Sequence, residues 1–429
     1  MLHSTPVRSI QKQSPMTRRR VQLLGALLVS AFLPYFIRLM LTPGSAGDPP
    51  ALNTFGGNAV AVFIAFWVRL SVEPFPGVRS SSLNLPVASA SHAAVVVGIV
   101  LLRLPYDRSF LLAGYIIHLL WLYAIYFFAQ RREDLAIAIV PYGDHRGLTE
   151  IDTIDWRVMA RPSFDELDGC EAIVADFGAD MPAEWEAFLA DAAVDGRVVY
   201  QVKQLFESLT GRVEIEHISE NSFGSLMPAR GYFHFKEMLD LFAAVLLLPL
   251  LLPTIGLVAL AILAERKGPV FFRQKRVGHG GQMFDVLKFR TMYSYDPDAS
   301  PDERLRAITL IADKRITPLG RILRHARLDE LPQLWNVLRG EMSWIGPRPE
   351  ASILSDAYTA DIPFYRYRHV VKPGISGWAQ VNQGHVADVD EVHRKLHYDF
   401  YYIKYFSPWL DLLILFRTVK TMLTGFGAR

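Results

Sequence analysis

Long apolar runs separated by short polar stretches dominate the first third of the chain. A helix needs about 20 apolar residues to span a bilayer core, so this pattern predicts four transmembrane helices over residues 21–130. Residues 71–91, rich in Pro and Ser, are typical of a loop, and the third run is short unless the small residues before it also enter the membrane. The four runs are residues 21–41, 55–70, 93–102 and 110–129.

Basic residues at both ends of this region set its orientation. Three arginines at residues 18–20 precede the first run, and two at residues 131–132 follow the fourth. Cytoplasmic flanks of membrane helices carry an excess of Lys and Arg, so residues 1–20 are predicted to be a cytoplasmic tail. Arg38 and Arg69 lie near segment ends, and we interpret them as anchors that snorkel to the interface. The first run lacks a small-residue cleavage site, so we expect no cleavable signal peptide.

The pattern changes over residues 134–227, where short apolar runs alternate with helical spacing. This alternation predicts a small cytoplasmic α/β domain, Rossmann-like, with a parallel sheet. The turn at residues 142–147 is not a G-x-G-x-x-G turn, so dinucleotide binding is unsupported. A structural or oligomerising role and small-ligand sensing both remain open. The expected strands are residues 135–140, 156–159, 172–177 and 198–202, and the expected helices are residues 182–193 and 204–209.

A further apolar run at residues 238–263 is interrupted by Pro249 and Pro253. Basic residues flank it on both sides, at positions 230, 236, 266 and 267, which indicates that both ends are cytoplasmic. We therefore predict a re-entrant helix hairpin over residues 236–264, broken by the prolines, which remove N–H donors. Lys236 and Asp240, one helical turn apart, are expected to pair at the membrane edge. An ordinary kinked spanning helix is the alternative.

The last part of the chain predicts a mainly helical domain. Two strands at residues 270–273 and 284–289 flank a glycine turn at residues 278–281, which indicates a hairpin. Thr317 followed by Pro318 is a typical helix start. Aromatic, basic and apolar residues at helical spacing over residues 398–423 suit helices in the interface plane. The fold class is therefore a membrane protein of the α+β type.

Two adjacent carboxylates, Asp329 and Glu330, lie among arginines that include Arg324 and Arg348. Pro332 fits the first position of a helix and Gly340 fits just past its end, which puts both acids at a helix N-terminus. Such a site favours phosphates, and Mg²⁺ usually binds through one or two carboxylates plus substrate phosphates. The pattern indicates a carboxylate that meets a phosphorylated, metal-bound substrate. A salt-bridged helix start is the alternative.

Two other stretches carry candidate ligand-binding groups. Lys288 and Arg290 alternate along a predicted strand and are expected to face the same way, as weaker phosphate-binding candidates. In residues 372–380 the glycines allow close backbone approach to a ligand, and Trp378 could stack on a ring. A plain turn is the alternative for that stretch.

Composition limits the remaining function classes. A chain of 429 residues suggests two or three domains, and an apolar fraction of 51% points to membrane segments. The net charge of +2 gives no nucleic-acid signature. The single cysteine, Cys170, excludes an intramolecular disulfide and a Cys-based metal site. The chain contains no H-E-x-x-H, G-x-S-x-G or P-loop motif.

Six ordered motifs in residues 231–429 resemble the bacterial sugar transferases that act on polyprenyl phosphate, the monotopic polyprenyl-phosphate glycosyl-1-phosphate transferases. Two positions depart from the family pattern: Glu237 stands where a basic residue is common, and Leu252 stands where Ser often precedes the hairpin proline, Pro253. The motifs are Lys236 with Asp240, GPVFFRQKRVG at residues 268–278, KFRTM at 288–292, LDELPQL at 328–334, IGPRP at 345–349 and KPGISGWAQV at 372–381.

The resemblance implies a catalytic domain over residues 231–429 and the large architecture of the family, with four N-terminal spans. It implies a multi-pass protein of the bacterial inner membrane that primes exopolysaccharide, capsule or O-antigen synthesis on the cytoplasmic face. Asp329 would attack the β-phosphorus of a Mg²⁺-bound UDP-sugar, UMP would leave, and undecaprenyl phosphate would then take the phosphosugar. By the same resemblance Asp329 and Glu330 hold Mg²⁺, and the re-entrant motif is Lys236, Asp240 and Pro253. The phosphate-binding candidates are Arg324, Arg348, Lys288 and Arg290.

Two other function classes compete with this expectation. One is a non-catalytic membrane scaffold or sensor that acts through the α/β domain; the other, a nucleotide-sugar dehydratase or epimerase, would need the missing glycine-rich turn. The sequence does not identify the sugar: glucose or galactose is suggested by the architecture, and a GlcNAc or GalNAc donor stays open. Membrane lipid is an expected partner, nucleic acid is not, and a homodimer is compatible with the sequence.

Overall fold

The structure is a computed structural model that describes residues 19–44, 47–72, 80–129, 136–214, 228–265, 268–293, 313, 315–383 and 389–424. It is mostly helical, with several long apolar helices and some small sheets. The chain divides into two units, Met1–Gly211 and Arg212–Arg429. Most of the predicted tail (residues 1–18) and the basic pairs at residues 131–132 and 266–267 lie outside the described residues.

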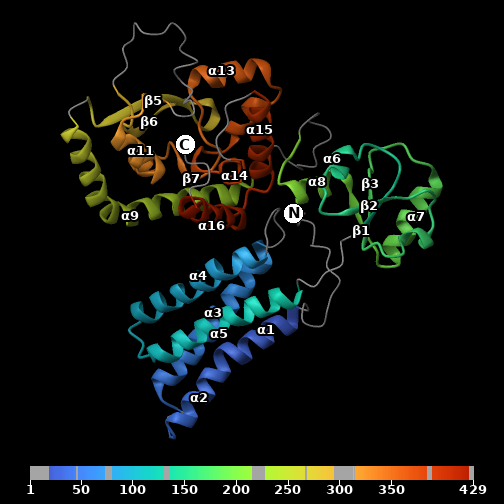
Figure 1. The fold of residues 1–429 in the computed structure, drawn as a ribbon, viewed down its shortest axis with the longest axis horizontal. Helices are drawn as coiled ribbons and strands as arrows, with labels where there is room; N and C mark the ends of the chain where they lie inside the picture. The colour runs from blue at the N-terminus through green and yellow to red at the C-terminus, as the bar shows by residue number, and fades with distance from the viewer. Residues whose placement is uncertain are drawn as a thin grey trace. The chain divides into compact units, whose positions relative to one another are not determined.

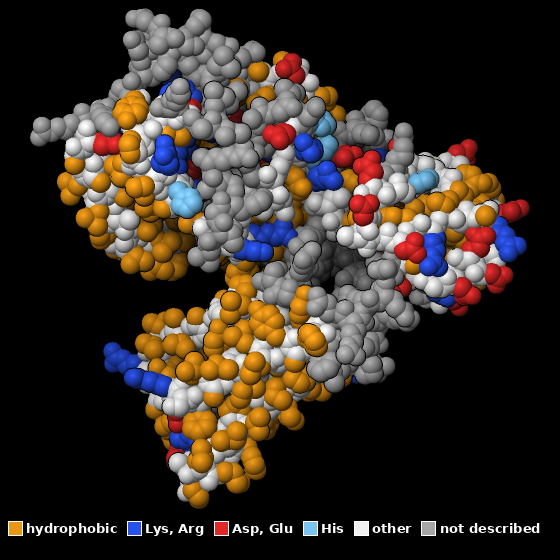
Figure 2. All heavy atoms as spheres, viewed as in Figure 1, with side chains coloured by type: hydrophobic (Ala, Val, Ile, Leu, Met, Phe, Trp, Pro, Cys, Tyr) orange, Lys and Arg blue, Asp and Glu red, His pale blue; other side chains and the backbone are white. Residues whose placement is uncertain are grey.

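Long apolar helices form the first part of unit 1. In the described residues five helical stretches of the whole chain are long and apolar enough to cross a membrane, and four of them lie here. Figure 2 shows the surface of this region dominated by hydrophobic side chains, whereas charged groups are frequent over the α/β elements. The helices are α1 (Arg19–Leu27), the π-helical turn η2 (Leu28–Phe32), α2 (Leu33–Leu41), α3 (Pro49–Val72), α4 (Ser80–Leu101) and α5 (Arg108–Ala129).

Helix α4 corrects the loop expected at residues 71–91. The helix begins at Ser80 and continues through Pro86, so the small residues before the third apolar run are helical. Backbone groups inside a bilayer must be satisfied within the segment, which favours helix over loop for this stretch. Arg69 is also placed differently from the prediction: it is only 8% exposed, buried in the bundle instead of reaching the surface. Arg38 pairs with Asp107 (Nε–Oδ2 3.2 Å).

The α/β elements confirm the predicted parallel sheet. Its strands run in the order β2-β1-β3-β4, all parallel. One face of the sheet packs on α7 through Trp185 and Phe188, and the other on α8 through Leu205. The elements are β1 (Ala136–Ile139), α6 (Arg146–Thr149), β2 (Asp155–Val158), η3 (Phe164–Leu167), β3 (Ala172–Ala175), α7 (Ala183–Val194), β4 (Val198–Gln201) and α8 (Val202–Thr210).

Unit 2 begins with one long helix, α9 (Arg230–Ala264), which is helical through both Pro249 and Pro253. The expected interruption of the helix is therefore not present. Figure 1 instead shows the ribbon of α9 changing direction along its length. Internal prolines bend a helix because they remove one hydrogen bond and crowd the carbonyl of the preceding turn.

Both arms of α9 pack on the same domain. Ala244 of the first arm belongs to the same buried apolar cluster as Val286 of β6 (Met283–Phe289), and Ile262 of the second arm shares a second cluster with Phe289 of the same strand. A fully buried aliphatic side chain such as Ile262 contributes about 1.5–3 kcal/mol. The opposite side of α9 stays apolar and open, with Leu250 70% and Leu257 68% exposed.

The remaining elements of unit 2 confirm the predicted hairpin and helix start. Strands β5 and β6 pair antiparallel, and Thr317 caps its helix by accepting the Gly320 N–H at 2.9 Å. A second small sheet pairs β7 and β8 in parallel. The elements are β5 (Phe271–Val277), η5 (His279–Gly281), β6, α11 (Pro318–His325), η7 (Leu328–Gln333), α12 (Leu334–Leu338), β7 (Ser343–Ile345), α13 (Ser352–Asp361), η8 (Tyr365–Val370), β8 (Gly374–Ser376), α14 (Trp378–Asn382), α15 (Val389–Lys404) and α16 (Pro408–Thr424).

The aromatic stretch expected to lie in an interface plane belongs to two helices with different surroundings. On α15, Phe400, Tyr401 and Tyr402 are each at most 2% exposed and form part of the domain core. On α16, Leu415 and Val419 are about half exposed. The aromatic residues of this stretch are therefore mainly core residues, and α16 carries the exposed apolar face.

Candidate active site

The two adjacent carboxylates lie in the first turn of η7, a 3₁₀ helix that runs directly into α12. The helical segment therefore begins before the predicted position, with Pro332 inside it. Gly340, at φ +74°, follows the end of α12 as predicted. Arg327, just before η7, has φ 57°, a conformation that costs energy for a residue other than glycine. The local backbone thus holds Asp329 and Glu330 at an N-terminal turn, where negative charge is favoured.

Two basic side chains from different parts of the domain pair with one oxygen of Glu330. Its Oε1 lies 2.9 Å from Lys288 Nζ on β6 and 2.6 Å from Arg348 Nη2, in the segment after β7. Burial alone would raise the pKa of Glu330, but Arg348 and Lys288 hold that pKa well below its usual range. Glu330 is therefore an ionised carboxylate, and its charge raises the pKa of the Arg348 guanidinium in turn.

Asp329 has the opposite environment. It is only 9% exposed, yet among the described residues its carboxylate has neither an ion pair nor a hydrogen bond at contact distance. Burial, with repulsion from Glu330 added to it, raises the pKa of Asp329 despite the more distant Lys288, Arg324 and Arg348. Neighbouring titratable groups whose environments separate their pKa values mark different chemical roles. The environments of Asp329 and Glu330 therefore differ as expected for two carboxylates with different roles.

The four predicted phosphate-binding cations are not equivalent. Burial lowers the pKa of Lys288 to about 8, although Glu330 opposes this. Arg324 Nε donates to Thr291 Oγ1 at 2.9 Å, which fixes its guanidinium in the field of Asp329. Arg290 instead donates from Nε to the Pro269 carbonyl at 2.8 Å and faces the C-terminal end of α9. The structure brings Lys288, Arg324 and Arg348 to the acidic pair and gives Arg290 contacts elsewhere.

Two positioning residues escaped the sequence analysis. Asn336 is 1% exposed and joins α12 to β6, since its Nδ2 donates to the Asp285 carbonyl at 2.8 Å and its Oδ1 accepts the Leu287 N–H at 3.1 Å. Arg368, paired with Asp399 at 2.8 Å, donates to the Arg348 carbonyl at 2.9 Å. For Asn336 the sequence signal is a polar residue between apolar neighbours, which does not identify its partner, and Arg368 lies among other polar and aromatic residues that do not single it out.

The glycines of residues 372–380 serve the fold and do not face an open ligand site. A Cβ on Gly374 would lie 2.1 Å from the Gly346 nitrogen, and a Cβ on Gly377 would lie 2.3 Å from the Gly346 oxygen. The close backbone approach predicted from these glycines is therefore between β8 and the IGPRP segment that carries Arg348. Trp378 is 1% exposed, stacked on Tyr401 with ring centroids 5.5 Å apart, so it is not free to stack on a substrate ring.

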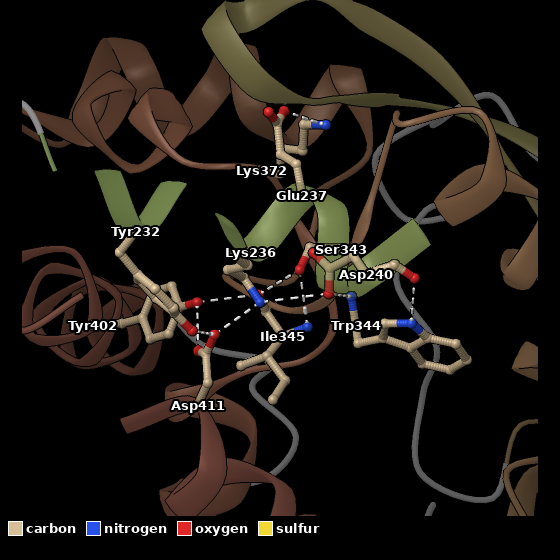
Figure 3. A network of polar contacts seen from close by, with 10 residues as sticks. All are labelled: Tyr232, Lys236, Glu237, Asp240, Ser343, Trp344, Ile345, Lys372, Tyr402 and Asp411. Atoms are coloured by element: carbon tan, nitrogen blue, oxygen red, sulfur yellow. Dashed lines mark hydrogen bonds and ion pairs between the residues drawn. The ribbon is translucent and has the colours of Figure 1, made fainter. Parts of the chain in front are cut away.

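The first turns of α9 carry a second buried polar group (Figure 3). The predicted pair is confirmed, with Lys236 Nζ 3.7 Å from Asp240 Oδ1. A closer partner of Lys236, at 2.8 Å, is Asp411 in the first turn of α16, which the sequence analysis missed. Glu237, where the family pattern has a basic residue, pairs with Lys372 at 2.7 Å. The third residue of the predicted motif, Pro253, lies within α9.

The donor set of the acidic pair fits a magnesium ion that is shared with a substrate. Among the described residues no group of three or more His, Cys, Asp or Glu side chains could hold a metal alone. The adjacent Asp329 and Glu330 supply hard oxygen donors, and Mg²⁺ is commonly bound by one or two carboxylates plus substrate phosphates. The surrounding cations suit the phosphates of such a substrate.

Comparisons with known proteins agree with this arrangement. A family model described as bacterial sugar transferase matches residues 231–425. The UDP-N-acetylgalactosamine-undecaprenyl-phosphate N-acetylgalactosaminephosphotransferase of Aeromonas hydrophila is 41% identical over 383 residues, 89% of each chain. A UDP-glucose:undecaprenyl-phosphate glucose-1-phosphate transferase of Caulobacter vibrioides is 46% identical over 193 residues, 44% of this chain and 70% of the relative. The Escherichia coli enzyme of the same description is 40% identical over 186 residues, 43% of this chain and 39% of the relative.

Proposed function

Because the chain belongs to the bacterial sugar transferase family and is an enzyme of the phosphotransferase type, we propose that it transfers a sugar phosphate from a UDP-sugar to undecaprenyl phosphate and releases UMP. The substrates are those in the names of its relatives, one of which is similar over nearly the whole chain. We assign the reaction to the cytoplasmic face of the bacterial inner membrane, as the priming step of exopolysaccharide, capsule or O-antigen synthesis. The scaffold alternative receives no support from the relatives.

The observation that carries this proposal is the contrast between the two adjacent carboxylates. Glu330 is neutralised by Lys288 and Arg348, whereas Asp329 is buried beside these cations without a partner of its own among the described residues. A carboxylate can serve as a covalent nucleophile. It can approach a charged diphosphate only where cations offset the repulsion, and Lys288, Arg324 and Arg348 supply that charge.

We assign the two steps of the reaction to Asp329. In the first, a carboxylate oxygen of Asp329 attacks the β-phosphorus; a P–O bond to Asp329 forms, and the bond to the oxygen bridging the α-phosphorus breaks, so that UMP leaves with that electron pair. In the second, a phosphate oxygen of undecaprenyl phosphate attacks the same phosphorus. The bond to Asp329 then breaks, the carboxylate is restored, and a lipid diphosphate sugar is the product.

Side chains from β6, α11 and the segment after β7 bind the phosphates. Arg348 and Lys288 are released in part from Glu330 as the diphosphate enters, because the planar guanidinium of Arg348 and the ammonium of Lys288 both donate to phosphate oxygens. Arg324, held by Thr291, adds positive charge near Asp329. Asp329 and Glu330 would hold Mg²⁺, which supplies charge neutralisation at the diphosphate when bound.

We propose four crossings before α9 and a re-entrant course for α9 itself, and the packing of the two arms of α9 supports the re-entrant course. Ala244 near one end and Ile262 near the other both pack on the domain that holds the acidic pair. A helix that crossed the bilayer between these points would draw that domain into the hydrocarbon, where buried charges are costly. We therefore propose that α9 inserts its exposed leucine face into one leaflet and returns, which leaves the site at the headgroup level.

UMP release tests the reaction. Purified protein in lipid nanodiscs receives undecaprenyl phosphate, Mg²⁺ and one donor from a panel of UDP-GalNAc, UDP-GlcNAc, UDP-glucose and UDP-galactose; UDP-GalNAc comes first because the relative that covers 89% of the chain uses it. We expect one donor to give rapid UMP release that EDTA abolishes. Without acceptor, acid quenching with labelled donor should trap a phosphosugar on the parent protein and none on Asp329→Asn. Turnover of Asp329→Asn at the parent rate would refute the nucleophile.

Cysteine labelling tests the topology. In a Cys170→Ser background, Arg273→Cys lies on an exposed part of β5, after α9, and Asp48→Cys lies before α3. We expect an impermeant thiol reagent applied to intact spheroplasts to label position 48 and not position 273, and to label both after lysis. Labelling of position 273 from outside would show that α9 crosses the bilayer.

A further inference from the structure

The α9–α16 cluster, which consists of Tyr232, Lys236, Asp240, Tyr402 and Asp411, has no role in the chemistry proposed above. Its members come from α9, α15 and α16, and its three charged side chains are each at most 9% exposed as residues (Figure 3). Buried ion pairs often add little net stability compared with apolar residues of similar size. Orienting neighbouring groups is therefore a better explanation for this cluster than a contribution to stability.

Asp411 is the centre of the cluster. Its Oδ2 lies 2.8 Å from Lys236 Nζ and 2.5 Å from the Tyr232 hydroxyl, and its Oδ1 lies 2.8 Å from the Tyr402 hydroxyl. Three donors on one carboxylate satisfy the charge. Because these donors come from α9 and α15, Asp411 joins the start of α16 to both helices.

The cluster is also attached to strand β7. The Trp344 backbone N–H lies 3.5 Å from Asp240 Oδ1, and the Trp344 indole N–H donates to the Asp240 carbonyl at 3.1 Å. The Tyr402 hydroxyl lies 3.1 Å from the Ile345 carbonyl, which shares the single hydroxyl proton with Asp411 Oδ1. These contacts fix both residues at the end of β7. The chain then passes through Gly346 and Pro347 to Arg348.

The segment between β7 and Arg348 has little freedom of its own. The Gly346 N–H donates to the Ser376 carbonyl at 2.8 Å, and the Pro347 carbonyl accepts the Gly374 N–H at 3.0 Å. A displacement of β7 is therefore passed on to Arg348, whose guanidinium lies 2.6 Å from Glu330. A misplacement of 1 Å can cost about 100-fold in rate.

We propose that Asp411 and Tyr402 are positioning residues that hold β7 so that Arg348 meets Glu330 and the substrate phosphates. The inference rests on the proposed function of Arg348. Through this cluster, the positions of the first turns of α9 and α16 affect the geometry of the phosphate site. Arg324 is an internal reference, because it is held by Thr291 on a different part of the domain.

A double-mutant cycle tests the positioning role. We expect Asp411→Asn to lower kcat/KM for the UDP-sugar about 10-fold in the parent and by the same factor in an Arg324→Ala background. In an Arg348→Ala background it should change kcat/KM less than 2-fold, since the group that it positions is gone. Asp356→Asn, on the exposed side of α13, is the matched control and should leave kcat/KM unchanged in the parent and in both arginine backgrounds.

An equal effect of Asp411→Asn in both arginine backgrounds would overturn the proposal, because general destabilisation does not distinguish Arg348 from Arg324. Tyr402→Phe runs the same cycle with a milder change, the loss of one hydroxyl, and decides the question if Asp411→Asn fails to fold. We expect a 2- to 4-fold loss that again disappears with Arg348→Ala. UMP release by the parent tests the reaction separately, so a failed cycle concerns only the positioning role.

Discussion

Two buried ionic groups of residues 212–429 differ in how fully their charges are compensated. In the α9–α16 cluster, Asp411 is contacted by three donors, and the charged residues hold elements together. At the acidic pair, Glu330 is compensated by two cations and Asp329 has no direct partner among the described residues. The first arrangement fixes geometry, and the second leaves one carboxylate available for chemistry. We therefore expect that an uncompensated charge, more than burial alone, distinguishes the reactive carboxylate from the positioning one.

The largest expected effect comes from removing the uncompensated charge. We expect Asp329→Asn to lower kcat by about 10⁴-fold or more, as loss of a covalent nucleophile does. The unfolding temperature should stay level or rise, because the change relieves the repulsion that Glu330 exerts on Asp329. Single-turnover kinetics and thermal unfolding in the same nanodiscs measure both quantities. A large loss of stability would mean that Asp329 is structural, contrary to the comparison above.

Removing a compensating charge should instead lower the free energy of unfolding. Lys236→Met leaves Asp240 and Asp411 facing each other, and breaking a buried pair in this way costs about 3–5 kcal/mol. The triple variant Lys236→Met, Asp240→Leu, Asp411→Leu should recover much of that free energy of unfolding but not the parent kcat/KM. Chemical denaturation and UMP release separate the two effects. If the triple variant regained full activity, the cluster would have no positioning role.

How much of the fold and the site could be predicted from the sequence depends on how far apart in the chain the contacting residues lie. Apolar periodicity is local, so the membrane helices, the parallel sheet, the hairpin and the Thr317 cap followed from neighbouring residues. Partners far apart in the chain did not: Asp411 beside Lys236, and Arg368 behind Arg348, became visible only in the fold. The acidic pair itself was found because its two members are adjacent.

For two predicted ligand-binding residues the structure shows internal contacts that the sequence did not indicate. Arg290 and Trp378 carry groups that could bind a substrate, but each is held inside the domain by contacts of its own. Arg290 lies after the last residue of β6, so strand alternation does not control its direction. Residue type shows what a side chain can do, whereas burial decides whether it meets the substrate.

A smaller effect distinguishes the cations. We expect Arg348→Lys to lower kcat/KM for the UDP-sugar by about 10- to 100-fold, because a single ammonium cannot reproduce a planar guanidinium contact. Arg290→Lys should change kcat/KM less than 3-fold and lower the unfolding temperature, because Arg290 contacts the end of α9. Steady-state kinetics and thermal unfolding of both variants measure the difference. Equal losses of kcat/KM in the two variants would indicate that Arg290 also binds the phosphates.

The smallest expected effect is a dependence on pH. Lys288 is charged below its pKa of about 8, so phosphate binding should weaken, and kcat/KM should fall, as pH rises through 8. At the acid end kcat/KM should fall as pH drops through the raised pKa of Asp329, since only the ionised carboxylate attacks. Lys288→Arg should extend the plateau above pH 8, because guanidinium stays charged. An unchanged alkaline limb in that variant would assign it to another group.

The crossing of backbones at Gly346, Gly374 and Gly377 has a consequence for how this protein can vary. At each position a single added methyl group would come within 2.3 Å of another residue's main-chain atom. In a saturation library screened for UMP release, these three codons should return glycine alone, while Gly340, with no main-chain atom within reach of an added Cβ, should tolerate asparagine. Tight backbone packing would then restrict which substitutions are tolerated around the segment that carries Arg348.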